Sequence, residues 1–147
     1  MSLRARLSEE MKTAMKAKDT LRLSSIRLIL SAVRNREIDL KKELDDQEIV
    51  EVIASLVKQR KESIKVYSDA GRTDLAEKEE RELSCLLEFL PPQLSEDEIG
   101  ELVLQAIVET GAQGARDMGK VMKALMSKVA GRADGRLVSE IVRQKLA

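Results

Sequence analysis

Apolar residues recur along the chain at spacings of three and four, the period of an amphipathic α-helix. Capping residues, glycines and prolines divide this pattern into seven predicted helices. Four are expected at about 3–17, at about 20–40, from Asp45 or Asp46 to Gly71, and from Thr73 or Asp74 to the prolines at 91–92. Three more are expected after Ser95, over 118–129, and after Asp134. No segment alternates as a strand would, so the predicted fold class is all-α.

The adjacent prolines Pro91 and Pro92 mark the strongest candidate for a domain boundary, because a proline disfavours helix in the residue before it. We therefore expect a four-helix N-terminal part over residues 1–90, a hinge at 91–94, and a three-helix part over 95–147. No internal repeat is visible.

The composition argues against a self-contained catalytic site. Histidine is absent, which removes the usual general base and the commonest transition-metal ligand. The single cysteine, Cys85, stands among leucines and is expected to be a buried, inert thiol. None of the common nucleotide-binding or hydrolase motifs occurs. We therefore expect no catalytic residues, no cofactor and no metal.

The sequence also bears on the cellular compartment. One cysteine suits a reducing environment, and no apolar run approaches the roughly 20 residues needed to span a bilayer. Residues 1–36 are basic and amphipathic, which a mitochondrial presequence would also be. Because their helical pattern continues without a break into the rest of the chain, we expect a cytoplasmic protein that does not enter a membrane.

Charge is neutral in sum but uneven along the chain. Residues 1–36 hold nine Lys/Arg against three Asp/Glu, and residues 115–147 hold eight against three. Residues 91–114 hold five Asp/Glu and no Lys/Arg. Because a nucleic acid needs a local basic surface rather than a high overall charge, the neutral total does not exclude one as a ligand.

The basic C-terminal part supplies the candidate binding residues, which are Gly119, Lys120, Lys123, Arg132 and Arg136. One interpretation is a surface that contacts phosphates, since helix starts offer free N–H groups and a glycine permits close approach. The other is tight helix packing with solvated basic side chains, which periodicity and charge alone favour. Tyr67 and Phe89 are the only aromatic residues, so a ligand RNA would be recognised by shape and phosphates rather than by stacked bases.

The third and fourth predicted helices carry opposite charges. Lys58, Arg60, Lys61 and Lys65 precede the turn, and Glu77, Glu79, Glu80 and Glu82 follow it. Ion pairs across a helical hairpin are the favoured interpretation, and a surface for a partner is the alternative.

Several segments resemble YqeY-type proteins. They are MKTAMKAKD at 11–19 with residues 21–23 and 27, KQRKES at 58–63 with residues 67, 70–72, 74–76, 79 and 82–83, LPPQLS at 90–95, MGKVM at 118–122, and GRADG at 131–135 with residue 138. The resemblance extends over essentially the whole chain and keeps the motif order. Proteins of this type are similar to the C-terminal tail of the GatB subunit of glutamine-dependent aspartyl/glutamyl-tRNA amidotransferase.

The resemblance implies an all-helical, two-domain fold and a stand-alone relative of a tRNA-contacting tail. In the amidotransferase the chemistry belongs to other domains and subunits, so the link to carbon–nitrogen ligases with glutamine as amide donor describes an association rather than an activity expected here. Asp134-Gly135 departs from the GatB tail, which more often has a small residue and proline.

Three hypotheses follow for the function. The first is a non-catalytic module that binds tRNA or another structured RNA. The alternative is an adaptor that docks on an amidotransferase, a synthetase or another helical partner, and a third is an amidotransferase subunit with a weak influence on catalysis. The sequence leaves the oligomeric state open.

Overall fold

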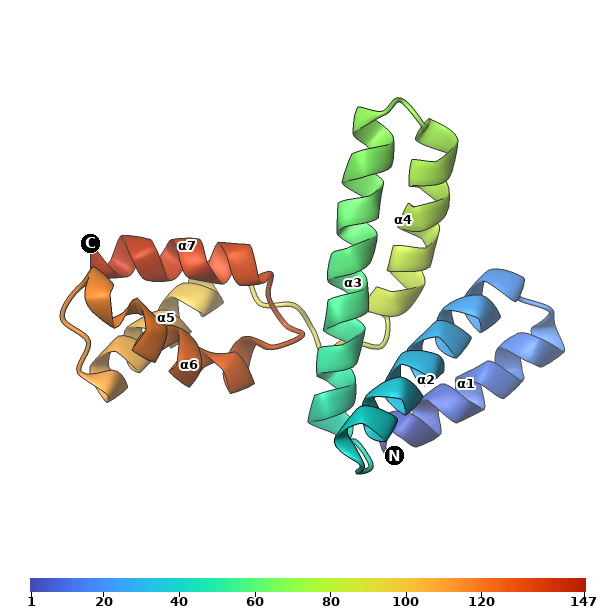
Figure 1. Ribbon diagram of the computed structural model, residues 1–147, viewed down its shortest axis with the longest axis horizontal. Coiled ribbons are helices and arrows are strands. Elements are labelled where there is room, and N and C mark those ends of the chain that lie inside the picture. Colours follow the sequence, from blue (N-terminus) through green and yellow to red (C-terminus); the bar gives the residue numbers. More distant parts are fainter. The chain divides into compact units, whose positions relative to one another are not determined.

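The computed structural model describes all residues from 1 to 147 and is all-α, which confirms the predicted fold class. The helices are α1 (Leu3–Ala17), α2 (Thr20–Leu40), α3 (Asp46–Asp69), α4 (Thr73–Leu87), α5 (Glu96–Thr110), α6 (Met118–Val129) and α7 (Gly135–Leu146), with a short 3₁₀ helix η1 (Ala115–Asp117) before α6 (Figure 1).

Side chains at the predicted caps set most of the helix starts. The side chains of Asp45 and Ser95 each accept the backbone N–H of the residue three positions on. The side chains of Glu48 and Glu98 in turn accept the backbone N–H of Asp45 and Ser95, so both helix starts are capping boxes. At the other ends, the left-handed backbone of Lys18 and Gly111 terminates α1 and α5.

The end of α4 differs from the prediction. The helix stops at Leu87, before the prolines, and Phe89 and Leu90 continue as a turn whose N–H groups bond to the carbonyls of Leu86 and Leu87. The turn brings Phe89, which is 2% exposed, into the core. The early end of α4 therefore goes together with burial of the Phe89 ring. The position of the prolines in the sequence does not reveal that the helix ends before them.

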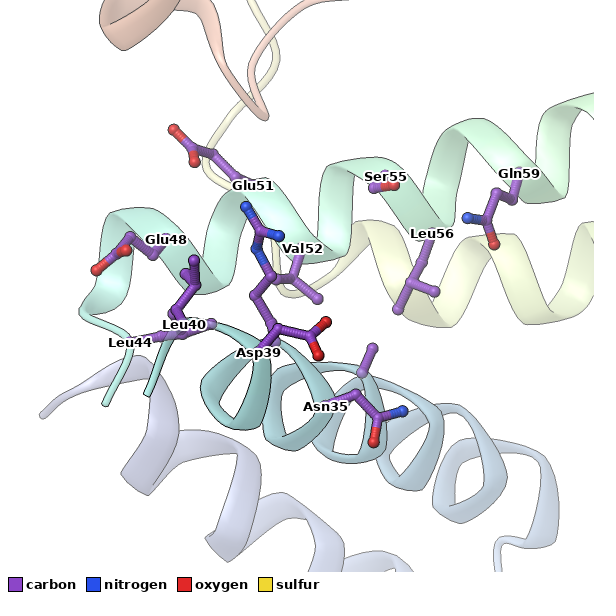
Figure 2. Close-up of a pocket in the computed structure, with 12 residues that line it drawn as sticks. Asn35, Asp39, Leu40, Leu44, Glu48, Glu51, Val52, Ser55, Leu56 and Gln59 are labelled. Atoms are coloured by element: carbon purple, nitrogen blue, oxygen red, sulfur yellow. The ribbon is translucent and has the colours of Figure 1, made fainter. Parts of the chain in front are cut away.

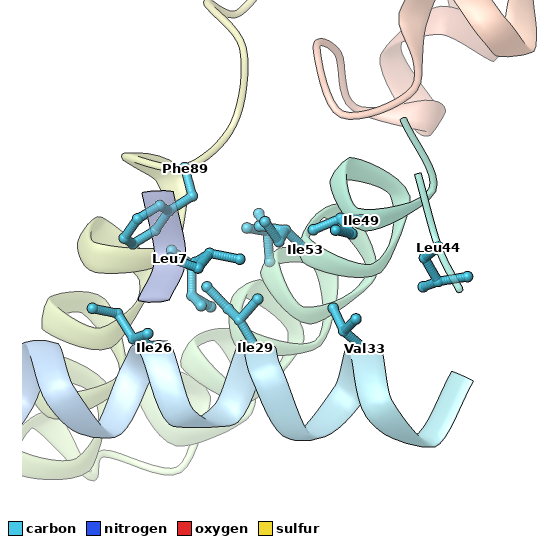
Figure 3. Close-up of a cluster of buried hydrophobic side chains, with 10 residues drawn as sticks. Leu7, Ile26, Ile29, Val33, Leu44, Ile49, Ile53 and Phe89 are labelled. Carbon is cyan, nitrogen blue, oxygen red and sulfur yellow. The ribbon is translucent and has the colours of Figure 1, made fainter. Parts of the chain in front are cut away.

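The chain forms two compact units, Met1–Leu90 and Pro91–Ala147. The first unit contains two helical hairpins, α1–α2 and α3–α4. Its core is a continuous apolar cluster, part of which Figure 3 shows: Leu7, Ile26, Ile29, Val33, Leu44, Ile49, Ile53, Val57, Leu86 and Phe89.

An ion-pair cluster around Phe89 ties the end of α4 to α1 and α2. The guanidinium groups of Arg6 and Arg22 lie 4.9 and 5.6 Å from the centre of the Phe89 ring. Arg22 also pairs with Glu10 at 2.5 Å and with Glu88. These pairs raise the pKa of Arg22, chiefly through the hydrogen bond to Glu88. These charged side chains thus have partners within the first unit, and the cluster serves to pack that unit.

The outer half of the α3–α4 hairpin extends away from α1 and α2 (Figure 1). Arg60 on α3 reaches Glu79 at 2.6 Å and Glu82 at 3.0 Å on α4. This confirms the predicted ion pairing across the hairpin for Arg60.

Cys85 is half-buried rather than buried. Desolvation raises the pKa of its thiol, so little of the nucleophilic thiolate forms near neutral pH.

In the second unit α5, α6 and α7 enclose their own core: Ile99, Val103, Ala106, Val121, Leu125, Val129, Val138, Ile141, Val142 and Leu146. Residues 91–94, the predicted hinge, fall within this unit. No helix of the chain combines the length and apolar character that a membrane crossing requires.

Candidate nucleic-acid interface

The predicted binding residues lie on three consecutive parts of the second unit. Gly119, Lys120 and Lys123 are in the first half of α6, Arg132 is in the loop between α6 and α7, and Arg136 is in the first turn of α7.

Lys120 and Lys123 project to solvent because α6 is amphipathic. Val121 and Leu125 on its inner face are fully buried, whereas both lysines are exposed. The Lys120 side chain is 68% exposed, and its Nζ is 3.9 Å from Asp117, which is a loose, solvent-screened contact. Lys123 has no carboxylate within ion-pair distance. Both charges are therefore available to an external anion.

Gly119 has no packing role within the second unit. A Cβ atom built there would meet nothing within 4 Å, and the residue is exposed. This contradicts the interpretation that the glycine allows another helix to pack closely. The N-terminus of α6 also lacks a side-chain cap, because Asp117 accepts the N–H of Gln113 at 2.9 Å instead. The Met118 N–H at this helix start bonds to the Ala115 carbonyl of η1, so the start is only partly available to an anion.

Arg132 and its loop are held in place by residues 92–94, which precede α5. The Arg132 Nε donates to the Pro92 carbonyl at 3.3 Å, while the Arg132 carbonyl accepts the Leu94 N–H at 2.7 Å. Gln93 adds a bond from Nε2 to the Gly131 carbonyl at 2.9 Å. These three bonds fix the loop that presents Arg132 without using a carboxylate, so the guanidinium keeps its charge unpaired.

Two acidic groups modulate the charge near this loop. The pKa of Glu98 is lowered, first by the Ser95 backbone N–H and hydroxyl of the capping box and then by the positive charge of Arg132. Asp134 caps α7 by accepting the Arg136 N–H at 2.8 Å, while the exposed Arg136 side chain has no ion pair. The loop is therefore basic, but less so than the count of arginines suggests.

The basic side chains are spread along α6 and the loop after it rather than gathered in a single pocket. Lys120 and Lys123 lie in the first half of α6, and Arg132 follows its last residue. A helix of 12 residues is about 18 Å long at about 1.5 Å per residue. A spread of this order suits several phosphates of a nucleic-acid backbone better than one small anion.

Sequence reasoning missed further basic residues near this surface. Arg116 in η1 is exposed next to the start of α6, and Arg143 is exposed on α7 two turns beyond Arg136. Neither has a carboxylate within ion-pair distance. The excess of basic residues over 115–147 was the signal that could have included them. Lys128 differs, because it contacts Glu109 of α5 at 3.7 Å.

A search for families with a matching sequence model finds Yqey-like protein over residues 4–146. The chain belongs to this family. The match extends over nearly the whole sequence, so the resemblance seen in the motifs is confirmed.

Curated relatives of this YqeY-like chain share the name "Altered inheritance of mitochondria protein 41, mitochondrial". The Kluyveromyces lactis protein is 40% identical over 108 residues, which cover 71% of this chain and 58% of that protein. The Lachancea thermotolerans protein is 39% identical with the same coverage. The Pyrenophora tritici-repentis protein is 34% identical over 142 residues, or 95% of this chain and 78% of that protein. The chain thus spans 58% of the length of the first two.

Proposed function

We propose that this YqeY-like protein is a non-catalytic module that binds structured RNA, with tRNA as the expected ligand, through Lys120, Lys123, Arg132 and Arg136. The observation that supports the proposal is the state of these side chains. The nearest carboxylate contact among them is the loose 3.9 Å approach of Lys120 to Asp117. Their charges are therefore not already neutralised by tight ion pairs.

The chemistry of the surface favours phosphates over bases. The second unit contains no aromatic residue, since Tyr67 and Phe89 both lie in the first. Base stacking is thus not provided there, whereas basic side chains bind phosphate oxygens without reading sequence. A folded RNA with a defined arrangement of phosphates is the ligand class that fits.

A second candidate function is a protein adaptor that docks on an amidotransferase, a synthetase or another helical protein. The observation that favours it lies on α5, which carries five carboxylates and no basic residue and leaves Leu104 and Val108 48% and 80% exposed. In both proposals the link to tRNA-dependent amidation is an association, and this chain supplies no amide-transfer chemistry of its own.

The location is a separate proposal. A cytoplasmic protein remains our prediction, and the mitochondrial names of the relatives make the mitochondrion the alternative. Fractionation of cells that express the tagged full-length protein distinguishes the two.

The test of RNA binding is a titration of labelled tRNA at two salt concentrations. Four phosphate contacts at a slope of about −0.9 each reduce the affinity about 150-fold between 50 and 200 mM salt. In the double variant Lys120→Ala with Lys123→Ala, two contacts remain and the loss falls to about 12-fold. The matched control is Lys58→Ala with Lys61→Ala, two exposed lysines at the same spacing on α3, which should bind as the wild type does.

Absence of saturable binding at low salt would refute the RNA proposal. Capture of an amidotransferase or synthetase that survives RNase treatment would favour the adaptor. Glutamine-dependent amidation of misacylated tRNA, measured with and without the protein, tests the weak catalytic influence of an amidotransferase subunit.

A further inference from the structure

The first unit has a hollow of about 530 Å³ between α2 and α3, in a different unit from the candidate RNA surface (Figure 2). The α2 wall is made by positions 32, 35, 36, 39 and 40, and the α3 wall by 48, 51, 52, 55, 56 and 59. Both sets follow the helical spacing of three and four, so each helix presents one continuous stripe. The α3 stripe is about 16 Å long at about 1.5 Å per residue, or about three helical turns. We call this hollow the α2–α3 groove.

The groove has an apolar floor and a polar rim. Ala32, Val52 and Leu56 are only partly buried by their own unit, and Leu40 is 40% exposed. Asn35, Ser55 and Gln59 add uncharged polar groups at the edge. An apolar centre surrounded by polar groups is the usual composition of a protein–protein contact.

The free charge of the groove is acidic. Glu48 forms an ion pair with Lys42, whose Nζ lies 2.8 Å from the Glu48 carboxylate. This pair lowers the pKa of the Glu48 carboxyl. Asp39 on α2 and Glu51 on α3 are exposed, come from opposite walls (Figure 2), and have no basic group within ion-pair distance. Arg36, which is also exposed and unpaired, is the one basic residue of the lining, so Asp39 and Glu51 leave a net free charge of one negative unit. Two unpaired carboxylates therefore flank the apolar floor.

We propose that the α2–α3 groove docks an amphipathic helix of about three turns from another protein. Its apolar face lies on Leu40, Val52 and Leu56, and basic residues beside that face reach Asp39 and Glu51. Helix-in-groove recognition of this kind needs an apolar floor of matching length and complementary charge at its edges, and both are present.

Other occupants fit less well. A nucleic acid would be repelled by Asp39 and Glu51. A second copy of this chain has its helical apolar faces committed to its two cores. Among its exposed large apolar residues, only Leu104 and Val108 stand four positions apart on one helix, and they belong to the acidic helix α5, which would place like charges together. A basic helix from a different protein avoids both conflicts.

The experiment is a titration of the full-length protein with a fluorescent helical peptide of about 14 residues, with leucines at helical i, i+4 and i+7 positions and lysines beside them. A second peptide carries glutamates in place of the lysines. We expect saturable binding of the lysine peptide and at least tenfold weaker binding of the glutamate peptide.

Two sets of variants locate the binding site. Ser55→Arg fills the groove from an exposed position and should weaken peptide binding at least tenfold, whereas Ser68→Arg, exposed at the far end of α3, should not. Asp39→Asn with Glu51→Gln should remove the preference for the lysine peptide, and Glu62→Gln, exposed on α3 outside the groove, should keep it.

Four results would overturn the proposal. They are no saturable binding of the lysine peptide, equal binding by Ser55→Arg and the wild type, displacement of the peptide by tRNA, and self-association of the protein that Ser55→Arg abolishes. The third would make a nucleic acid the occupant of the groove, and the fourth a second copy of this chain.

Discussion

The ion pairs of Arg60 should stabilise the outer half of the α3–α4 hairpin by a measurable amount. Its Nη1 lies 2.6 Å from Glu79 and 3.0 Å from Glu82, and the three side chains are 25%, 16% and 16% exposed. The residues of the apolar core lie nearer the base of the hairpin, up to Val57 on α3 and from Leu86 on α4. Beyond this cluster Ala76 on α4 is buried at 5% exposed, and the Arg60 ion pairs add charged contacts between α3 and α4 there.

The perturbation is Arg60→Met, which keeps an unbranched apolar stem and removes the charge. Exposed ion pairs contribute up to about 1 kcal/mol, and hydrogen bonds to charged groups about 1.5–3 kcal/mol. We take about 1 kcal/mol for each of the two partly screened pairs, and therefore expect a local destabilisation of about 2 kcal/mol. Such a change accelerates exchange through local opening about 30-fold.

The assay is native-state hydrogen exchange of the backbone amides in α3 and α4 of the full-length protein. Amides in the outer hairpin should exchange faster in Arg60→Met, while those near Ile53 should keep the wild-type rate. The control is Arg72→Met, whose pair with Asp74 is exposed and long at 3.4 Å, and it should exchange as the wild type does. A change below threefold in the outer hairpin would refute the reasoning, because the pairs would then contribute no more than exposed ones.

Three further predictions concern the cores, the α6–α7 loop and acid stability. Leu125→Ala removes a fully buried side chain and should destabilise the second unit by about 3 kcal/mol, seen as an earlier urea transition of that unit's amide signals. Gly131→Ala forces a side chain onto a backbone with φ of 74° and should cost about 1–2 kcal/mol in the same measurement. The pKa of Glu37 is lowered by the Leu44 N–H, which donates to it at 2.9 Å, and then by Arg4. The stability that Glu37 contributes is therefore complete above its ordinary pKa of 4.5 and lost as the pH falls through its lower folded value. Glu37→Gln should flatten the acid limb of the first unit's unfolding curve, and an unchanged limb would show that other carboxyls control it.

Much of the fold could be read from the sequence because local signals agree with the tertiary structure. Asp45, Ser95 and Asp134 all cap the helices whose starts they were expected to mark. Each of these signals acts over three residues or fewer, so no knowledge of distant contacts is needed.

The features that failed to follow from the sequence depend on distant contacts. The early end of α4 goes with burial of Phe89 against α1 and α2, which helical periodicity cannot show. The structure leaves the four basic residues predicted from the sequence without tight ion pairs, as it does Arg116 and Arg143. The sequence could not distinguish Arg132, whose Nε donates to the Pro92 carbonyl, from the freely exposed Arg136. The α2–α3 groove escaped notice because it depends on the angle between two helices rather than on the pattern of either.

The three hydrogen bonds between residues 92–94 and the α6–α7 loop decide where the second unit can be separated from the first. A fragment that begins at Pro91 retains the acceptor and donors that position Arg132, whereas one trimmed to Ser95 loses all three partners at once. When the second unit is fused to another protein, residues 91–94 should therefore be kept as part of the folded unit and not be replaced by a linker.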